Sequence, residues 1–275
     1  MISKQDIVNA NPVLIVYPAG VGGEHIAHTL SVCSNEFEDL SAAFNYSRNQ
    51  YHTQCVLRYT QHVENIDDFD SAIATQYKGN FVAKNKRIII KDHPTQHSVD
   101  FYSKHFDNLI VLLVFPLTQA VYFSELAFKK LSVKVSCPID RKYLSLNVTD
   151  NLTEQQIDHI LSEVNQHEWV WRHEIHNLVS AMSETKTLCP IEHHNTLDII
   201  KMYHADSIIN TYTTLAPLYQ AHFKNSYVIN CDDLTTNSSA FWKQIQHIIP
   251  TLDVETATSI SNVWIERNNK LGFSQ

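Results

Sequence analysis

A glycine-rich turn between two apolar segments constrains this chain more than any other feature. Residues 13–30 read VLIVYPAGVGGEHIAHTL, in which a β-branched run ends at Pro18 and apolar residues resume after Gly23 at helical spacing. Three of the five glycines in the chain, Gly20, Gly22 and Gly23, lie in this turn. The pattern predicts a strand, a tight loop and a helix. Backbone amides of such a loop, with the positive end of the helix, form an anion site without a charged side chain.

The turn matches neither of the two common nucleotide-binding motifs. A Walker A motif ends in Gly-Lys-Ser/Thr, but no lysine occurs between Lys4 and Lys78. The dinucleotide pattern GxGxxG also fails, because Gly22 is followed directly by Gly23 and then by Glu24. The turn is therefore either an anion loop that binds through its amides or a purely structural connection. The candidate binding residues are Pro18, Ala19, Gly20, Val21, Gly22, Gly23 and Glu24.

Three later apolar runs predict the other strands of a parallel sheet. They span residues 87–91, 109–115 and 226–230. Runs that are apolar throughout are typical of central strands covered by helices on both faces. The polar and turn residues that follow these runs are His93-Pro94, Pro116 and Asp232-Asp233. Ligands of open parallel sheets bind beyond the carboxyl ends of strands, so these residues and the glycine loop are expected at one edge.

The remaining chain favours helices within one domain. Residues 153–184 contain no glycine or proline and predict one long helix, and residues 205–224 and 238–249 predict two more. Residues 132–150 look irregular, with short strands possible there. Asp232 and Asp233 are expected to have a structural role, capping the helix that follows them and fixing the turn at the end of the strand. Without an internal repeat or a flexible linker, we predict a single three-layer α/β domain with a central parallel sheet over residues 1–275.

Charge and cysteine content exclude several classes of function. The formal net charge is −8, which argues against a nucleic-acid binder, because such proteins neutralise phosphates with clustered Lys and Arg. No segment reaches the roughly 18 uninterrupted apolar residues of a membrane helix, and the N-terminus has no apolar signal core. The five cysteines form no CxxC pair, which fits reduced thiols. We expect a cytoplasmic protein with neither nucleic-acid nor membrane partners.

The densest group of basic residues lies just before the second predicted strand and at its two ends. It comprises Lys84, Lys86, Arg87 and Lys91. This cluster either faces solvent at the entrance of the strand or forms one wall of an anion pocket.

The 16 histidines form no recognisable metal motif. His173 and His176 are one position too close for HExxH spacing. His159, Glu163 and His167 lie at i, i+4 and i+8, a spacing that equally describes the exposed face of a helix. No metal site is predicted.

Taken together, the strand ends resemble those of the P-loop sulfotransferases, which use 3′-phosphoadenosine 5′-phosphosulfate (PAPS). Tyr17–Gly23 occupies the place of that family's Tyr-Pro-Lys-Ser-Gly-Thr-Thr type of loop. Residues 90–94, Ile-Lys-Asp-His-Pro, resemble the strand that ends in Lys-Thr-His. Ser124 follows the third strand, and residues 231–234, Cys-Asp-Asp-Leu, resemble the late Tyr-Glu-Asp-Leu segment. The resemblance covers residues 13 to about 250 in the correct order.

The resemblance implies the roles of individual residues. His93 would be the general base that accepts a proton from a hydroxyl or amine of a small-molecule or glycan acceptor, with Lys91 as a second catalytic residue. The glycine loop would hold the 5′-phosphosulfate of PAPS, and Ser124 would contact the 3′-phosphate. Arg267 begins a segment similar to the family's late Arg-x-Gly, which also touches that phosphate. The product would be 3′-phosphoadenosine 5′-phosphate, and no metal is expected.

Two cations of the family pattern are absent. Ala19 stands in place of the loop lysine and Pro116 in place of the 3′-phosphate arginine. Lys91, Lys84 and Arg267 are the candidates to replace them. Weaker donor binding is expected, because Lys and Arg normally neutralise this polyanion. An inactive phosphate-binding or structural module on the same fold is the alternative. A nucleotide kinase is less favoured, because the Walker lysine and its Ser/Thr magnesium ligand are missing.

Overall fold

The computed structural model describes two compact parts of the chain. The described residues are 4–18, 20–38, 44–45, 50–51, 85–131, 133–134, 155, 158, 162, 169–170 and 196–270. One unit comprises residues 1–119 and 208–269, and the second comprises residues 120–207 and 270–275. The assignment of a single domain over residues 1–275 stays a prediction.

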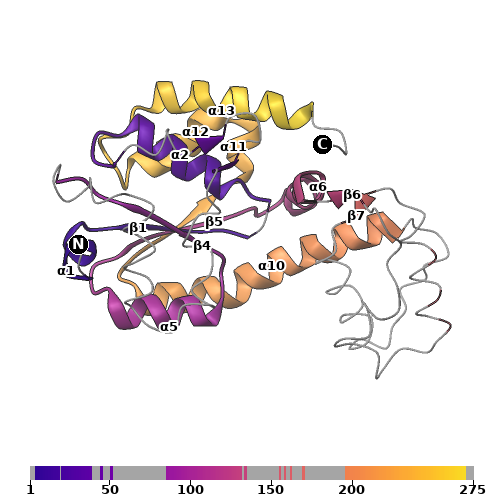
Figure 1. Ribbon diagram of the computed structural model, residues 1–275, viewed down its shortest axis with the longest axis horizontal. Coiled ribbons are helices and arrows are strands. Elements are labelled where there is room, and N and C mark those ends of the chain that lie inside the picture. The colour runs from indigo at the N-terminus through magenta and orange to yellow at the C-terminus, as the bar shows by residue number, and fades with distance from the viewer. Residues whose placement is uncertain are drawn as a thin grey trace. The chain divides into compact units, whose positions relative to one another are not determined.

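A four-stranded parallel sheet forms the centre of the first unit (Figure 1). The order of its strands is β4 (Ile89–Asp92), β1 (Val13–Val16), β5 (Ile110–Phe115) and β8 (Asn225–Asn230). Val13 pairs with Ile89 on one side and with Ile110 on the other. All four strands predicted from the apolar runs are confirmed, and every pairing is parallel. Their carboxyl ends therefore lie at one edge of the sheet.

Helices cover both faces of this sheet, which makes the first unit a three-layer α/β structure (Figure 1). On one face, Leu14, Val16 and Ile90 share a buried core with side chains of α5 (Gln96–His105) and α10 (Thr196–His222). α1 (Lys4–Asn9) contributes Ile7 to the same core. The predicted helix over residues 205–224 is the C-terminal part of α10.

The opposite face carries the helix that follows the glycine loop. It is covered by α2 (Gly23–Cys33), α12 (Ser238–Gln246) and α13 (Val254–Asn269), with the short α11 (Asp232–Thr236) at the end of β8 (Figure 1). α2 and α13 run antiparallel. The N–H of Asp253 donates to the Cys33 carbonyl (2.8 Å) at one end, and Trp264 lies against Gly22 at the other. The predicted helix over residues 238–249 ends three residues early, at Gln246.

One helix prediction is wrong in part. Within residues 153–184, Trp169–Val170 forms the strand β7, which pairs antiparallel with β6 (Val133–Lys134). An aromatic and a β-branched residue suit a strand, and pairing with a distant segment overrides local helical spacing. Gln155, Asp158 and Ser162 are helical, and the rest of that stretch lies outside the described residues. β6 itself is a short strand within the segment expected to be irregular.

The other described elements are small. α6 (Ala120–Leu131) belongs to the second unit, and β2 (Phe44–Asn45) pairs antiparallel with β3 (Gln50–Tyr51) in the first. None of the helices among the described residues has the length and apolar character needed to cross a membrane.

Candidate functional site

The glycine loop has the backbone geometry that its composition predicts. Gly20 and Gly22 have φ angles of +86° and +85°, in the left-handed region that favours glycine. The N–H of Val21 donates to the carbonyl of Pro18 (3.3 Å), and the N–H of Ile26 donates to the carbonyl of Gly22 (3.0 Å). The loop therefore turns sharply after β1 and leads directly into α2. Ala19 lies outside the described residues.

Two aromatic side chains pack against the last glycines of the loop. A Cβ atom on Gly22 would lie 2.9 Å from Cζ2 of Trp264, and one on Gly23 would lie 2.1 Å from Cδ1 of Tyr17. Real Cβ atoms do not approach other atoms this closely, so both positions require glycine for packing as well as for any ligand. Tyr17 and Trp264 thus border the N-terminal end of α2.

His93 lies at the start of the glycine loop. Its Nδ1 is 2.8 Å from the carbonyl oxygen of Tyr17, and the two rings meet edge to face with centroids 5.2 Å apart. Because a carbonyl oxygen can only accept, Nδ1 carries the proton in this hydrogen bond. Nε2 is then the nitrogen with the lone pair, as a general base requires. The structure therefore brings the predicted base to the predicted loop.

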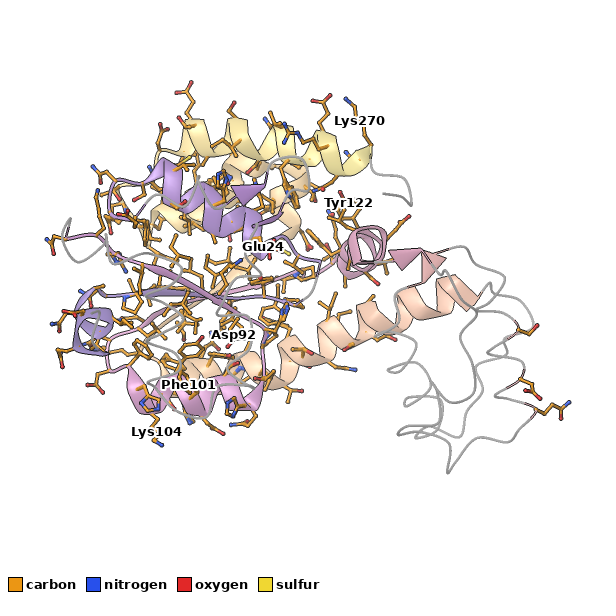
Figure 2. The ribbon with its side chains drawn as sticks, viewed as in Figure 1. Glu24, Asp92, Phe101, Lys104, Tyr122 and Lys270 are labelled. Atoms are coloured by element: carbon orange, nitrogen blue, oxygen red, sulfur yellow. The ribbon has the colours of Figure 1, made fainter. Side chains whose placement is uncertain are left out.

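Lys91 supplies a buried cation on the α2 side of the sheet. Its side chain is 3% exposed, and Nζ lies 3.7 Å from Oε1 of Glu24 in the first turn of α2. Figure 2 shows Glu24 between this helix and the sheet. A buried ammonium group requires an opposite charge, and the Glu24 carboxylate provides one. The side chain of Glu24 therefore balances Lys91, whereas its backbone amide is the part of the residue suited to an anion.

Asp92 points to the opposite face, because successive residues of a strand alternate (Figure 2). It is 2% exposed, and its Oδ2 accepts a hydrogen bond from Oγ of Ser98 (3.0 Å). Burial first, and the negative charge of Asp92 second, raise the pKa of Tyr102 and of Tyr219. No role was predicted for Asp92 from the sequence. Its place between Lys91 and His93 at a strand end was the signal that could have found it.

The prediction that Asp232 caps the following helix is wrong, since Cys231 occupies the N-cap of α11. Oδ2 of Asp232 instead accepts hydrogen bonds from the N–H of Leu117 (3.2 Å) and from the N–H (2.7 Å) and Oγ1 (2.8 Å) of Thr118. Oδ1 accepts from the N–H of Gln119 (3.1 Å). β5 and β8 are neighbours, so a residue just after β8 reaches the backbone amides that follow β5. Asp232 ties these two strand ends together.

The remaining predicted site residues are spread over the chain. Arg267 is exposed in the last turn of α13, three residues beyond the Trp264 that touches Gly22, which places it near the glycine loop. Pro116 is buried. Ser124 is 1% exposed in α6 of the second unit, and its predicted role stays a prediction. Lys84 lies outside the described residues.

Metal ligands do not gather in the described part of the chain. No group of three or more His, Cys, Asp or Glu side chains there could hold a metal ion. The candidate residues His159, Glu163, His167, His173 and His176 lie outside it.

No family model, curated protein or solved structure matches this chain. The structure shows a parallel four-stranded α/β fold. The resemblance to sulfotransferases depends on the residues at the strand ends.

Proposed function

We propose that this protein transfers a sulfuryl group from PAPS to a hydroxyl or amine acceptor, with His93 as the general base. The observation that carries the proposal is the 2.8 Å hydrogen bond between His93 Nδ1 and the Tyr17 carbonyl. It directs the lone pair to Nε2, beside a loop whose geometry suits an anion. A proton acceptor next to an anion site is what an in-line transfer requires.

The donor would bind to the loop amides of Gly22 and Gly23 at the positive end of α2. Lys91 replaces the lysine that is missing at position 19, reaching the first turn of α2 from the neighbouring strand β4. Its burial strengthens its interaction with a negative charge, because the surrounding dielectric is low. Arg267, in the last turn of α13, is the proposed contact of the 3′-phosphate.

The transfer itself exchanges one bond to sulfur for another. The acceptor oxygen or nitrogen attacks the sulfur while the bond from sulfur to the phosphate oxygen breaks, and Nε2 of His93 takes the proton of the acceptor. The products are the sulfated acceptor and 3′-phosphoadenosine 5′-phosphate. Lys91 lowers the energy of the charge that develops on the leaving phosphate.

One observation favours a second function, an anion-binding module without transferase activity. The loop after β5, where the family has an arginine, contains the buried Pro116 and is held by the carboxylate of Asp232. A carboxylate at this position disfavours a 3′-phosphate. In this alternative the glycine loop and Lys91 bind a simpler anion, and His93 is a structural residue.

Calorimetric titration with 3′-phosphoadenosine 5′-phosphate tests the donor site. The wild type should bind, though not below micromolar Kd at physiological salt, and Lys91→Met should weaken binding about tenfold or more, a change of about 1.4 kcal/mol. Lys86→Met is the matched control, because the Lys86 ammonium group contacts the Asn35 carbonyl near the start of β4. Equal binding by wild type and Lys91→Met would exclude Lys91 from the site.

Activity separates the two functions. His93→Ala should retain nucleotide binding, since a base contacts the acceptor, and should lower sulfuryl transfer by roughly 10² to 10⁴-fold. A wild type that binds the nucleotide but transfers nothing to a broad panel of alcohols, phenols, sugars and amines would support the binding module.

A further inference from the structure

The ladder of backbone hydrogen bonds between β1 and β4 ends at Pro94, the residue that follows His93. Within this parallel pair, the N–H of Tyr17 donates to the carbonyl of Asp92 (3.1 Å). In a parallel ladder, a residue bonds to the residues before and after its partner, so Tyr17 is opposite His93. The next hydrogen bond of the ladder would run from the backbone N–H of residue 94 to the carbonyl of Tyr17. That residue is Pro94, which has no N–H.

The imidazole of His93 takes the position of the missing donor. Its Nδ1 lies 2.8 Å from the Tyr17 carbonyl oxygen, the acceptor that a ladder bond from residue 94 would otherwise use. A side chain therefore completes the ladder where the backbone cannot. Because it replaces a backbone donor, the imidazole ring lies across the gap between β4 and β1, at the first residue of the glycine loop.

Asp92 holds the backbone of His93, and Ser98 holds the carboxylate of Asp92. Oδ1 of Asp92 accepts a hydrogen bond from the N–H of His93 (2.8 Å), and Oγ of Ser98 lies 3.1 Å from the His93 carbonyl oxygen. The same hydroxyl bonds to Oδ2 of Asp92. Ser98 is itself fixed, since its N–H donates to Oγ1 of Thr95, the N-cap residue of α5 (3.0 Å). The Asp92 carboxylate is buried, so its hydrogen bonds to His93 and Ser98 are shielded from water.

We infer that Asp92 and Pro94 are positioning residues for His93. Asp92 fixes the backbone of His93, and Pro94 reserves the Tyr17 carbonyl for Nδ1. Together they hold the imidazole in the Nδ1–H tautomer, with the lone pair on Nε2. The catalytic consequence of this arrangement rests on the proposed function, whereas the tautomer itself does not.

Nitrogen NMR of ¹⁵N-histidine-labelled protein tests the tautomer directly, at about pH 8.5 where an ordinary imidazole is neutral. The His93 signals are assigned by their loss in His93→Gln. The wild type should show a protonated Nδ1. Pro94→Ala introduces an N–H that competes for the Tyr17 carbonyl, so the Nε2–H form should increase. Asp92→Ala should have the same effect, and Asp92→Asn should retain the wild-type signature, because its Oδ1 still accepts from His93.

Asp100→Asn is the matched control. Asp100 is an exposed carboxylate on α5 that bonds to Gln96, and its replacement should leave the His93 signals unchanged. If Asp92→Ala does not fold, Pro94→Ala still decides the proposal, because it removes no buried group. An Nε2–H tautomer in the wild type, or an unchanged tautomer in Pro94→Ala, would overturn it.

Transfer assays distinguish this inference from the function on which it rests. Pro94→Ala should lower kcat about tenfold and leave the KM for PAPS unchanged, since it alters the orientation of the base but not the donor site. If the NMR results agree while the wild type transfers no sulfuryl group, the positioning role stands and the proposed function fails.

Discussion

The imidazole of His25 stacks on the indole of Trp264, with ring centroids 4.6 Å apart and ring planes at 15°. His25 is 2% exposed, and its Nε2 lies 2.9 Å from Oγ of Ser261, which also accepts a hydrogen bond from Nε1 of Trp242 (2.8 Å). Trp264 in turn lies against Gly22. The C-terminal helix α13 is therefore part of the support of the glycine loop.

Replacing Gly22 by alanine should destabilise the protein by about 1–3 kcal/mol, because the residue has a φ of +85° and its Cβ would lie 2.9 Å from Trp264. In a double-mutant cycle with Trp264→Leu, measured by urea unfolding, part of this cost should disappear, since the smaller side chain relieves the contact but not the backbone strain. Strict additivity would show that Trp264 does not restrict this position.

Asp232→Asn should cost about 2–4 kcal/mol, because the new amide group would face backbone donors that now share a buried carboxylate. Asp233→Asn is the control in the adjacent position. The Asp233 carboxylate accepts a hydrogen bond from the side chain of Gln244 (2.7 Å), and its replacement should cost about 1 kcal/mol or less. Urea unfolding of the two variants compares them, and equal losses would contradict the role of Asp232.

The two inner strands, β1 and β5, were predictable because they are buried and so are apolar without interruption. Residues 109–115 show this best, since the strand β5 (Ile110–Phe115) lies inside the sheet between β1 and β8. The edge strands gave a weaker signal, because β4 ends in Lys91 and Asp92 and β8 is mostly half-buried and carries polar residues. Trp169–Val170 was not predictable, because it pairs with Val133–Lys134, more than thirty residues away in the chain. Periodicity reports local burial but not a distant pairing partner.

The candidate site was partly predictable for the same reason. Strand ends of a parallel sheet meet at one edge, which brought His93 to the glycine loop. Strand order decides which loops are neighbours, so the contact of Asp232 with residues 117–119 could not be inferred from its position before a helix. The aromatic contacts of Gly22 and Gly23 also depend on tertiary packing.

Glu36 should make a pH-dependent contribution to stability. Partial burial acts to raise the pKa of Glu36, but hydrogen bonds from Thr251 and Arg87 and the Arg87 charge outweigh it and lower the pKa below 4.5. The contribution of Glu36 to stability is therefore fully present well above pH 4.5 and is lost as the pH falls through the lowered pKa. Glu36→Gln should cost about 0.5–1 kcal/mol at pH 7 in urea unfolding, and this cost should shrink as the pH falls below 4.5. A difference that persists undiminished in acid would contradict this assignment.

Cys33 should be an unreactive thiol in the folded protein. It is buried at the end of α2, and burial first, with the charge of Asp253 second, raises its pKa to about 11. At pH 8 its thiolate fraction is then about 10²-fold below that of an ordinary cysteine, and burial also blocks access. Iodoacetamide labelling followed by mass spectrometry should modify Cys33 only slowly until urea unfolds the chain. Asp253→Asn should change this rate little, because burial is the principal cause, and rapid labelling of the native wild type would contradict the prediction.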